Sequence, residues 1–335
     1  MNKKVAVVIL NWNGKSFLEQ FLPSVTKHSK DSRIIVADNN STDDSISFLT
    51  ENYSEIEVIR LDKNYGFAGG YNKALKQIDS EYFVLLNSDV EVTDNWLDPM
   101  LNLLDTDSSI AACQPKIKDY NNKSYYEYAG ASGGFIDKYG YPFCRGRVFD
   151  TLEEDKGQYD NVVEIFWASG ACLFIRSKLY HEIGGLDEFF FAHMEEIDLC
   201  WRLKNQGHKI MVCPSSTVYH IGGGTLNKIK PQKTFLNFRN SLLTLHKNLP
   251  KNVRLSVLIV RLCLDGIAGA KFLFSGKPNH TWAIMRSHFS FYSSISQNRL
   301  KRKLPNTPNL KGMINKSIVK VYFINKRKTY NSLEN

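Results

Sequence analysis

Residues 34–53 read IIVADNNSTDDSISFLTENY, and this stretch indicates how the first half of the chain folds. The apolar run Ile34–Ala37 is rich in β-branched residues and predicts a buried strand. Residues 38–43 have the composition of a turn. Asp44–Tyr53 has the pattern of a helix, with capping residues before it. A strand that leads directly into a helix is the repeating unit of a parallel sheet.

The same alternation continues on both sides of this unit. Further strands are predicted over Val5–Leu10, Glu57–Leu61 and Tyr82–Leu86, and further helices over Ser16–Lys27 and Gly70–Ile78. The chain therefore belongs to the α/β class, with a mostly parallel sheet flanked by helices. Ligands of such sheets bind beyond the carboxyl ends of the strands, so the residues that follow each strand are the candidate site.

Composition indicates one folded protein of substantial size. Of its 335 residues, 43% are hydrophobic and 23% are charged, which excludes wholesale disorder. Six cysteines show neither a C-x-x-C pair nor zinc-ligand spacing, which is typical of reduced, packed thiols. The apolar run Val5–Leu10 is too short for a signal peptide, so we expect a cytoplasmic protein.

Charge divides the chain near residue 225. Residues 1–225 contain 22 Lys and Arg against 32 Asp and Glu, whereas residues 226–335 contain 21 Lys and Arg against two acids, Asp265 and Glu334. Such a basic region predicts an anionic partner, either a membrane surface or a nucleic acid. No zinc-finger spacing, RNP-like segment or basic-region heptad accompanies the charge, so we expect no nucleic-acid partner.

The residues after the strands do not form a familiar nucleotide motif. Asn11-Trp12-Asn13-Gly14 fits neither the Rossmann fingerprint nor the P-loop. Asp38, directly after its strand, can bind a ribose or a base, whereas Thr42 and Asp43 are better explained as a turn with a helix cap. Glycines such as Gly69 and Gly70 at the start of a helix let phosphates approach the backbone, although they also serve tight packing.

A candidate metal ligand follows the fourth strand. Asp89 comes directly after a buried strand, beside the glycine-containing loop, where a divalent cation could bridge it to a diphosphate. The literal D-x-D at Asp105-Thr106-Asp107 follows a helical pattern in a polar stretch. We interpret it as a solvated loop.

Several segments in order resemble one enzyme family. They are residues 38–43, 64–70 and 86–89, then Ala168-Ser169-Gly170-Ala171-Cys172, the segment 184–188, and residues 195–202 with the sequence EEIDLCWR. Together they resemble the family-2 glycosyltransferases with the GT-A fold, especially the bacterial rhamnosyltransferase-like branch. The resemblance covers about residues 4–225. It divides the chain into a nucleotide-sugar half at 1–115, an acceptor and catalytic half at 116–225, and a basic, partly helical region at 226–335.

The resemblance implies an inverting transfer of a sugar from a dTDP- or UDP-sugar to an acceptor hydroxyl, in the synthesis of cell-envelope polysaccharide or lipid-linked oligosaccharide. It implies a divalent cation, Mn²⁺ or Mg²⁺, held by Asp89 and by His220, which precedes three glycines. Its nucleotide-sugar site would comprise Asn11, Asn13, Asp38, Asn64, Gly69, Gly70, Asn72, Asn87 and Ser88.

The base that deprotonates the acceptor is expected near residue 196. The family commonly has Glu-Asp there, and this chain has Glu195-Glu196. Glu196 is the preferred base, and Glu195 and then Asp198 are the alternatives. Asp198 can instead form an i,i+4 ion pair with Arg202 on a helix predicted from about Glu195 to Asn205.

The acceptor side of the cleft is implied to include Trp167, Ser169, Gly170 and Arg202. Tyr126, Tyr128 and Trp167 could stack on sugar rings or simply pack in the protein.

Residues 253–274 predict an amphipathic helix. Its longest uncharged run, Leu255–Val260, is far too short to span a membrane. Arg254, Arg261 and Asp265 fall in one sector and leave a wide apolar face, which either packs on the domain or lies in a membrane interface. Basic clusters at 299–303 and 326–328 follow and would attract anionic lipid, placing the protein peripherally on the inner face of the cytoplasmic membrane.

Two other functions remain open from the sequence. Asn87 and Glu196 stand where the family often has Asp, which would fit a catalytically degenerate nucleotide- or glycan-binding protein. A nucleotidyltransferase of the same fold would usually have a Gly-rich, basic signature after the first strand. Asn11-Trp12-Asn13-Gly14 lacks it.

Overall fold

The computed structural model describes residues 3–222, 230–300 and 310–333. Three features predicted from the sequence lie outside these ranges. They are the division near residue 225, the glycines Gly223 and Gly224 after His220, and residues 301–303 of the basic cluster. Within them, no helix is both long enough and apolar enough to cross a membrane.

The predicted βα units are present with small shifts at their ends. They comprise β1 (Val5–Asn11), α1 (Lys15–His28), β2 (Arg33–Asp38), α2 (Ser45–Asn52), β3 (Glu57–Arg60), α3 (Gly66–Leu75) and β4 (Tyr82–Asn87). β1 pairs in parallel with both β2 and β4, and β2 with β3. Helix α3 begins four residues before the predicted start, so Gly69 and Gly70 lie inside the helix.

The remaining strands extend this sheet on the β4 side. They are β5 (Val90–Val92), β6 (Ile110–Asp119), β11 (Val163–Ile165), β12 (Cys172–Arg176) and β13 (Lys209–His220). The order is β11-β13-β6-β12-β4-β1-β2-β3, with β5 paired to β13. β12 is antiparallel to β4 and β6, whereas β13 runs parallel to β6. The strand ends that contain Asn11, Asp38, Asn87 and His220 therefore meet at one edge of the sheet.

Both faces of the sheet are buried, which explains why β1 is apolar throughout. Ala6 and Val8 of β1 belong to one core cluster, together with Tyr71 of α3. Val5 and Val7 point into the other cluster, with Leu18 of α1. Helices α4 (Asp98–Thr106), α5 (Ser177–Glu182) and α6 (Glu195–Asn205) complete the cover, and η1 (Glu188–Phe190) is a short 3-10 turn before α6.

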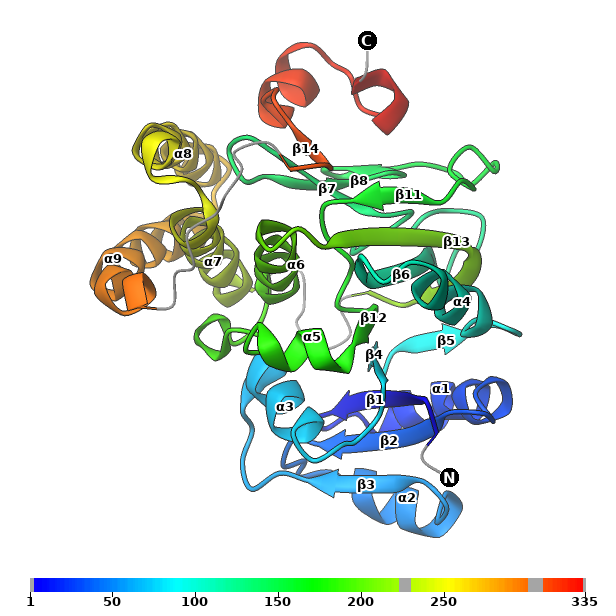
Figure 1. Ribbon diagram of the computed structural model, residues 1–335. Helices are drawn as coiled ribbons and strands as arrows, with labels where there is room; N and C mark the ends of the chain where they lie inside the picture. The colour runs from blue at the N-terminus through cyan, green and yellow to red at the C-terminus, as the bar shows by residue number, and fades with distance from the viewer. Residues whose placement is uncertain (1–2, 223–229, 301–309, 334–335) are drawn as a thin grey trace.

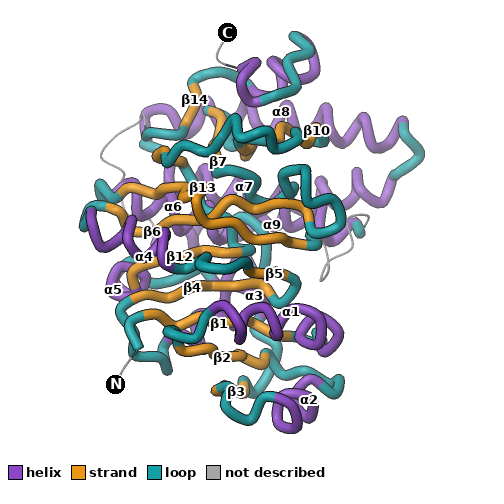
Figure 2. The backbone as a smooth tube through the Cα atoms, turned by 90° about the vertical axis from the view of Figure 1, so that its right-hand side faces the viewer, coloured by secondary structure: helices purple, strands orange, loops and turns teal. Residues whose placement is uncertain are grey.

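A second, smaller sheet lies beyond β13, as both views show (Figures 1 and 2). Its order is β10-β9-β8-β7-β14. The strands are β7 (Gly134–Asp137), β8 (Pro142–Cys144), β9 (Arg147–Val148), β10 (Thr151–Leu152) and β14 (Met313–Ile314). The C-terminal segment reaches this sheet through β14 and ends in a π-helical turn, η2 (Lys320–Ile324), and a 3-10 turn, η3 (Tyr330–Leu333). No cysteine forms a disulfide, and five of the six are buried.

Three helices form a layer beside α6 (Figure 1). They are α7 (Pro231–Asn248), α8 (Lys251–Phe274) and α9 (Pro278–Leu300). Helix α7 packs on α6 and also contacts both α8 and α9. The region after residue 225 therefore contains an ordered helical layer, and α8 covers the predicted amphipathic segment.

Candidate active site

The ends of β1 and β2 are joined by side-chain hydrogen bonds. Asn11 donates through Nδ2 to Asp38 Oδ1 and to Ser41 Oγ, each over 3.1 Å. Asp38 is 3% exposed, and its other oxygen accepts a bond from the backbone N–H of Ser41. The two predicted nucleotide-binding residues thus lie together at the sheet edge, on a loop that their own hydrogen bonds hold in place.

Asn13 supports the same loop. Its backbone has a φ of +50°, and its side-chain oxygen accepts bonds from the backbone N–H groups of Thr42 and Asp43. Asp43 in turn accepts a bond from the N–H of Lys15 at the start of α1. The interpretation of Thr42 and Asp43 as a turn and cap agrees with these contacts, while Trp12 between the two asparagines is 45% exposed.

The loop before α3 is tied to the end of β2 by Asn39. Asn39 donates to Asn64 Oδ1 over 3.1 Å and to the carbonyl of Gly66 over 3.0 Å, and it accepts a bond from the N–H of Tyr65. Asn64 lies at this edge of the sheet as expected, with its side-chain oxygen accepting the N–H of Gly66. Asn39 was not among the site residues predicted from the sequence.

Gly70 and Asn72, both predicted for the nucleotide-sugar site, make packing contacts within the protein. A Cβ at Gly70 would come within 2.8 Å of Leu10, so this glycine lets α3 approach β1. The Asn72 side chain donates to the carbonyl of Leu186 and accepts from the hydroxyl of Tyr180 and the N–H of Leu186. Asn72 therefore holds residues 180–188 against α3, and Gly69 is also buried within that helix.

Asp89, His220 and Glu127 form a buried chain of alternating charge. Asp89 Oδ1 lies 3.1 Å from His220 Nε2, and Glu127 Oε2 lies 3.3 Å from His220 Nδ1. All three side chains are at most 6% exposed. Burial alone would lower the pKa of His220, but the charges of Glu127 and Asp89 outweigh it and raise the pKa to about 10. The two predicted metal ligands are thus adjacent.

The backbone conformation and close packing at residue 222, two residues after His220, require a glycine. Its φ of +71° favours glycine, and a Cβ there would lie 2.4 Å from Glu127 Oε1. Glu127 was not selected from the sequence because it lies in an irregular segment with no strand or helix pattern around it.

The donor set suits a cation that takes most of its ligands from a substrate. Within the described ranges, no group of three or more His, Cys, Asp and Glu side chains is arranged to hold a metal. Asp89 and His220 supply one carboxylate and one imidazole 3.1 Å apart. Mg²⁺ is commonly bound by one or two protein carboxylates together with water and substrate phosphates. The residues therefore fit a cation shared with a diphosphate, provided that His220 loses its ring proton when the cation binds, because only a neutral imidazole is a metal ligand.

The literal D-x-D lies at the opposite edge of the sheet. Asp105 pairs with Lys4, which precedes β1, and accepts a bond from Tyr82 at the start of β4. Asp107 pairs with Lys209, the first residue of β13. These contacts place both carboxylates at the beginnings of strands whose ends form the candidate site.

The segment before α6 has a strained backbone. Phe191, His193 and Met194 all have positive φ angles, between 64° and 73°. Residues with side chains rarely adopt this conformation, and it persists only where the surroundings enforce it, often near functional sites. Asn240 of α7 enforces it here, since its Nδ2 donates to the carbonyls of residues 190, 192 and 193. Helix α6 begins directly after this strained segment.

Glu195 and Glu196 begin α6 as predicted. Glu195 is 4% exposed and Glu196 is half-buried, and each has a buried carboxylate oxygen, Oε2, with no hydrogen-bond partner among the described residues. Burial raises the pKa of Glu196 to about 7, and burial together with Glu196 raises that of Glu195 well above its usual range. Buried polar atoms are normally paired, so these oxygens are where a ligand group could bind.

Asp198 and Arg202 are structural. Arg202 Nε donates to Asp198 over 2.7 Å, which confirms the predicted i,i+4 ion pair. Asp198 is fully buried and also pairs with Lys247 of α7, which reaches Asp187 as well. Although burial would raise the pKa of Asp198, Lys247 and Arg202 hold it below its usual range.

The expectation that Asp198 could act as base is therefore corrected, because its oxygens are occupied by Lys247, Arg202 and Asn248. Arg202 is likewise not available to bind the acceptor substrate, because its guanidinium also donates to the carbonyls of Ile183 and Gly185.

The expected acceptor residues separate into two groups. Trp167 is 2% exposed, donates to the carbonyl of Phe135 and packs on Gly134, so its ring is not available to stack on a sugar. Tyr126 is fully buried, whereas Tyr128 is 40% exposed. Trp12 and Phe191 are also exposed, at 45% and 46%.

Ser169 and Gly170, by contrast, lie beside the candidate base. A Cβ built at Gly170 would lie 3.9 Å from Glu196 Cβ. Ser169 is buried and fixed by a bond from its N–H to Gln114 Oε1.

A chain of contacts joins the three parts of the site. A Cβ at Gly14 would lie 2.5 Å from Asn11 Oδ1 and 3.7 Å from Ser88 Oγ, so the β1 loop adjoins the end of β4. Asn87 donates its N–H to the carbonyl of Ala171, and the adjacent Gly170 lies beside Glu196. Asn11 Oδ1 is itself buried without a hydrogen-bond partner in the described structure. The strand ends and the start of α6 therefore border one region.

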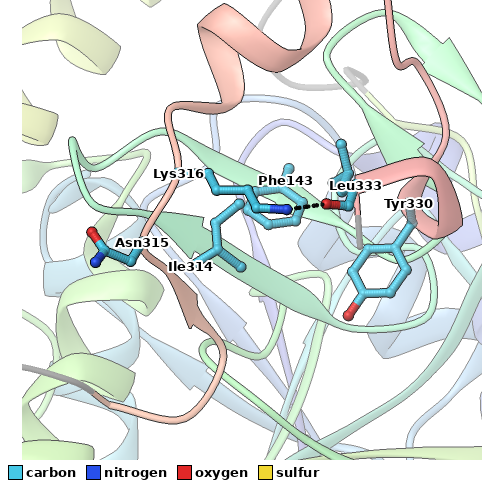
Figure 3. Close-up of a pocket in the computed structure, with 6 residues that line it drawn as sticks. All are labelled: Phe143, Ile314, Asn315, Lys316, Tyr330 and Leu333. Carbon is cyan, nitrogen blue, oxygen red and sulfur yellow. Dashed lines mark hydrogen bonds between the residues drawn. The ribbon is translucent and has the colours of Figure 1, made fainter. Parts of the chain in front are cut away.

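A separate cavity of about 320 Å³ lies between the small sheet and the C-terminal segment (Figure 3). It is lined by Phe143, Ile314, Asn315, Lys316, Tyr330 and Leu333. The Lys316 ammonium donates to the carbonyl of Leu333 across it. None of the candidate site residues lines this cavity.

Known proteins resemble the chain over most of its length. The N-acetylglucosaminyl-diphospho-decaprenol L-rhamnosyltransferase of Mycobacterium tuberculosis is 24% identical over 66% of this chain and 76% of its own. Rhamnosyltransferase WbbL of Escherichia coli is 21% identical over 64% of this chain and 83% of its own.

A solved structure shows the shared fold. TarS of S. aureus, residues 1–349 in complex with UDP-GlcNAc, superposes with a TM-score of 0.58 at 14% identity, covering 89% of this chain and 84% of its own. The architecture is thus the GT-A fold. The model of the family described as Glycosyl transferase family 2 matches residues 6–182. The chain therefore belongs to glycosyltransferase family 2.

Proposed function

We propose that the protein is an inverting glycosyltransferase that moves a sugar from a dTDP- or UDP-sugar to a hydroxyl of a glycan or lipid-linked acceptor. The main support is that Asp89 and His220, which follow or end β4 and β13, border the same region as the partly buried carboxylate of Glu196, because the N–H of Asn87 binds Ala171 and the neighbouring Gly170 packs beside Glu196. A group that binds a diphosphate and a group that accepts a proton are both needed, and they must face the same anomeric carbon.

The nucleotide lies, in this proposal, across the ends of β1 and β2. Asp38 accepts a hydrogen bond from the base or ribose, and Asn11 offers its unpartnered Oδ1 nearby. The exposed ring of Trp12 supplies an apolar surface on the same loop. Asn87 and Ser88 lie between this region and Asp89.

Asp89 and His220 would hold a divalent cation, Mn²⁺ or Mg²⁺. When bound, the cation would offset the charge that develops on the departing diphosphate. Glu127, on the far side of the imidazole, orients His220 so that Nε2 faces Asp89. Such a carboxylate behind a ligating histidine fixes the ring and its tautomer.

Glu196 acts as the base, with Glu195 as the alternative. The carboxylate takes the proton of the acceptor hydroxyl as the acceptor oxygen bonds to the anomeric carbon and the bond to the diphosphate oxygen breaks on the opposite face. A pKa near 7 suits this role, because a base works best when its pKa is close to the ambient pH.

The acceptor class is proposed from the relatives and not from a bound molecule. The M. tuberculosis relative is named for a decaprenol-linked substrate, which places that enzyme's acceptor on a lipid. We propose an acceptor of the same kind here, with the reaction at the cytoplasmic surface of the membrane in envelope glycan synthesis.

A thermal-shift panel of UDP, dTDP, GDP, CDP and ADP, each with Mn²⁺ or EDTA, tests the donor site. A nucleotide at about 100 times its dissociation constant adds ~2.7 kcal/mol of stability. We expect one or two nucleotides to raise the melting temperature only with Mn²⁺, and the matching sugar nucleotide to be consumed when an acceptor is present. Binding without any turnover would indicate the degenerate binding protein, and no shift with any nucleotide would contradict the donor site.

A further inference from the structure

Helix α8 packs on the protein with a side that contains a buried ion pair as well as the partly buried apolar residues Val253, Val257 and Leu262. The buried residues of this 24-residue helix are Leu258, Arg261, Asp265 and Gly269, which follow one another at intervals of three or four and form one stripe. Arg261 is 3% exposed and Asp265 is fully buried. In a surface helix of a globular protein the apolar side normally faces the core. On α8 the buried stripe instead includes the charged residues Arg261 and Asp265, and several large apolar side chains are left exposed.

Specific contacts hold the polar stripe in place. Arg261 donates to Asp265 over 2.7 Å and to the carbonyl of Tyr139, and its guanidinium lies 3.9 Å from the ring centroid of Tyr141. His288 of α9 approaches the other oxygen of Asp265 at 3.3 Å. The orientation of α8 is thus fixed by the turn between β7 and β8 and by α9.

The opposite side of α8 presents large apolar side chains to the exterior. Those that are more than half exposed are Leu255, Ile259, Ile267, Leu273 and Phe274, at 69%, 53%, 67%, 52% and 89%. We call these five residues the α8 face. They extend from residue 255 to residue 274, which is roughly 28 Å of helix at a rise of about 1.5 Å per residue. Helix α8 lies at the outside of the helical layer, separated from α6 by α7 (Figure 1).

The exposed charge that residues 226–333 contribute, in the region that contains α8, is exclusively positive. Asp265 is the only acid between residues 226 and 333, and it is fully buried. Lys251 and Lys271 on α8 and Lys277 after it are all exposed. A second copy placed face to face would bring two cationic surfaces together without a carboxylate between them. An anionic partner avoids this repulsion.

We propose that the α8 face docks on an anionic lipid bilayer, with α8 lying in the plane of the interface. Its apolar side chains enter the boundary between headgroups and acyl chains, while the lysines contact lipid phosphates. This inference deepens the proposed function by naming the surface that would bring the enzyme to a lipid-linked acceptor. It rests on that function only for the identity of the acceptor.

Helix α8 is linked through one helix to the strained segment before α6. Helix α7 contacts α8 on one side and binds the carbonyls of residues 190, 192 and 193 through Asn240 on the other. Helix α7 therefore lies between α8 and the strained segment that precedes Glu196.

Vesicle co-sedimentation of the full chain tests the inference without donor or acceptor. Wild type is compared with the double variant Ile267→Asp, Phe274→Asp on vesicles of phosphatidylcholine with or without phosphatidylglycerol. Both side chains are mostly exposed, so the substitutions should not disturb the fold. Val162→Asp, at a residue that is 47% exposed outside the helical layer, is the matched control.

We expect wild type and Val162→Asp to bind the phosphatidylglycerol vesicles, and binding to weaken as salt rises. The double variant should bind at least about tenfold more weakly, because two apolar anchors are lost and two negative charges are added. Equal binding by the double variant, or no wild-type binding to anionic vesicles, would overturn the proposal. So would a wild-type dimer that the double variant converts to a monomer.

The nucleotide thermal shift separates this inference from the proposed function. The double variant should respond to nucleotide and Mn²⁺ as wild type does. Vesicle binding without any nucleotide response would leave the docking surface standing and remove the donor site, whereas the reverse result would remove only the docking surface.

Discussion

Replacing the candidate base should make the protein more stable as well as less active. Burial raises the pKa of Glu196 from its ordinary value of 4.5 to about 7. The folded state therefore binds this proton more tightly than the unfolded state does, and stability falls as the pH rises from about 4.5 to about 7. Glu196→Gln keeps the shape of the side chain and removes the ionisation. The stability of the variant therefore lacks this fall with pH.

The size of the effect follows from the two pKa values. Each pKa unit corresponds to about 1.4 kcal/mol. Ionisation of Glu196 costs the folded state about 1 kcal/mol at about pH 5, where the unfolded group is partly charged, and about 3 kcal/mol at about pH 8. The free energy of unfolding of Glu196→Gln relative to wild type should therefore increase by about 2 kcal/mol between these pH values.

Urea unfolding of both proteins at the two pH values measures this difference, and transfer assays with donor and acceptor accompany it. Glu182→Gln, at an exposed glutamate on α5, is the control and should reproduce the wild-type values. We expect transfer by Glu196→Gln to fall by about 10²-fold or more, with nucleotide binding retained. A stability difference that does not change with pH would refute the burial argument, and full activity would move the base to Glu195.

Three further substitutions test other parts of the site. Asp89→Ala should abolish the Mn²⁺-dependent part of nucleotide binding, and unchanged calorimetric affinity with and without Mn²⁺ would remove Asp89 from the site. Glu127→Gln should weaken Mn²⁺-dependent nucleotide binding by about 10- to 100-fold, because His220 loses its orienting carboxylate; an unchanged affinity would show that Glu127 only fills space. Lys247→Met should lower the free energy of unfolding by about 3–5 kcal/mol, since Asp187 and Asp198 lose their shared partner. The exposed Lys178→Met on α5 is its control, and an equal effect of the two would contradict the assignment.

The sheet and its edge could be predicted because the signals are local. An apolar run followed by a polar turn indicates a strand and its end, and parallel strands bring their ends together. Asp38, Asp89 and His220 all follow or end strands, so their convergence needed only the strand order. Glu195 and Glu196 were found by resemblance to a known motif, and the structure adds that their helix follows a strained backbone.

Contacts between distant segments could not be predicted in the same way. Glu127 reaches His220 from a segment 93 residues earlier in the chain that has no periodic pattern. Trp167 has the character of a sugar-stacking residue, but the residues that bury it come from β7. Asn72 is a polar residue in a promising motif, yet its bonds are made with residues 180–188. In each case, the deciding partner is far away in sequence.

The charge composition of the sequence changes near residue 225, but the structure has contacts that join the residues on the two sides. The division into two regions stays a prediction, but ion pairs cross it. Lys247 of α7 lies between Asp187 and Asp198, with all three side chains at most 4% exposed. Removing one partner from such a buried group leaves an uncompensated charge, which is strongly destabilising. The basic helices therefore help to hold α6, and with it Glu196, in position. If the α8 face does bind lipid, the same layer of helices connects the membrane surface to the catalytic helix through packed, ionically bonded side chains.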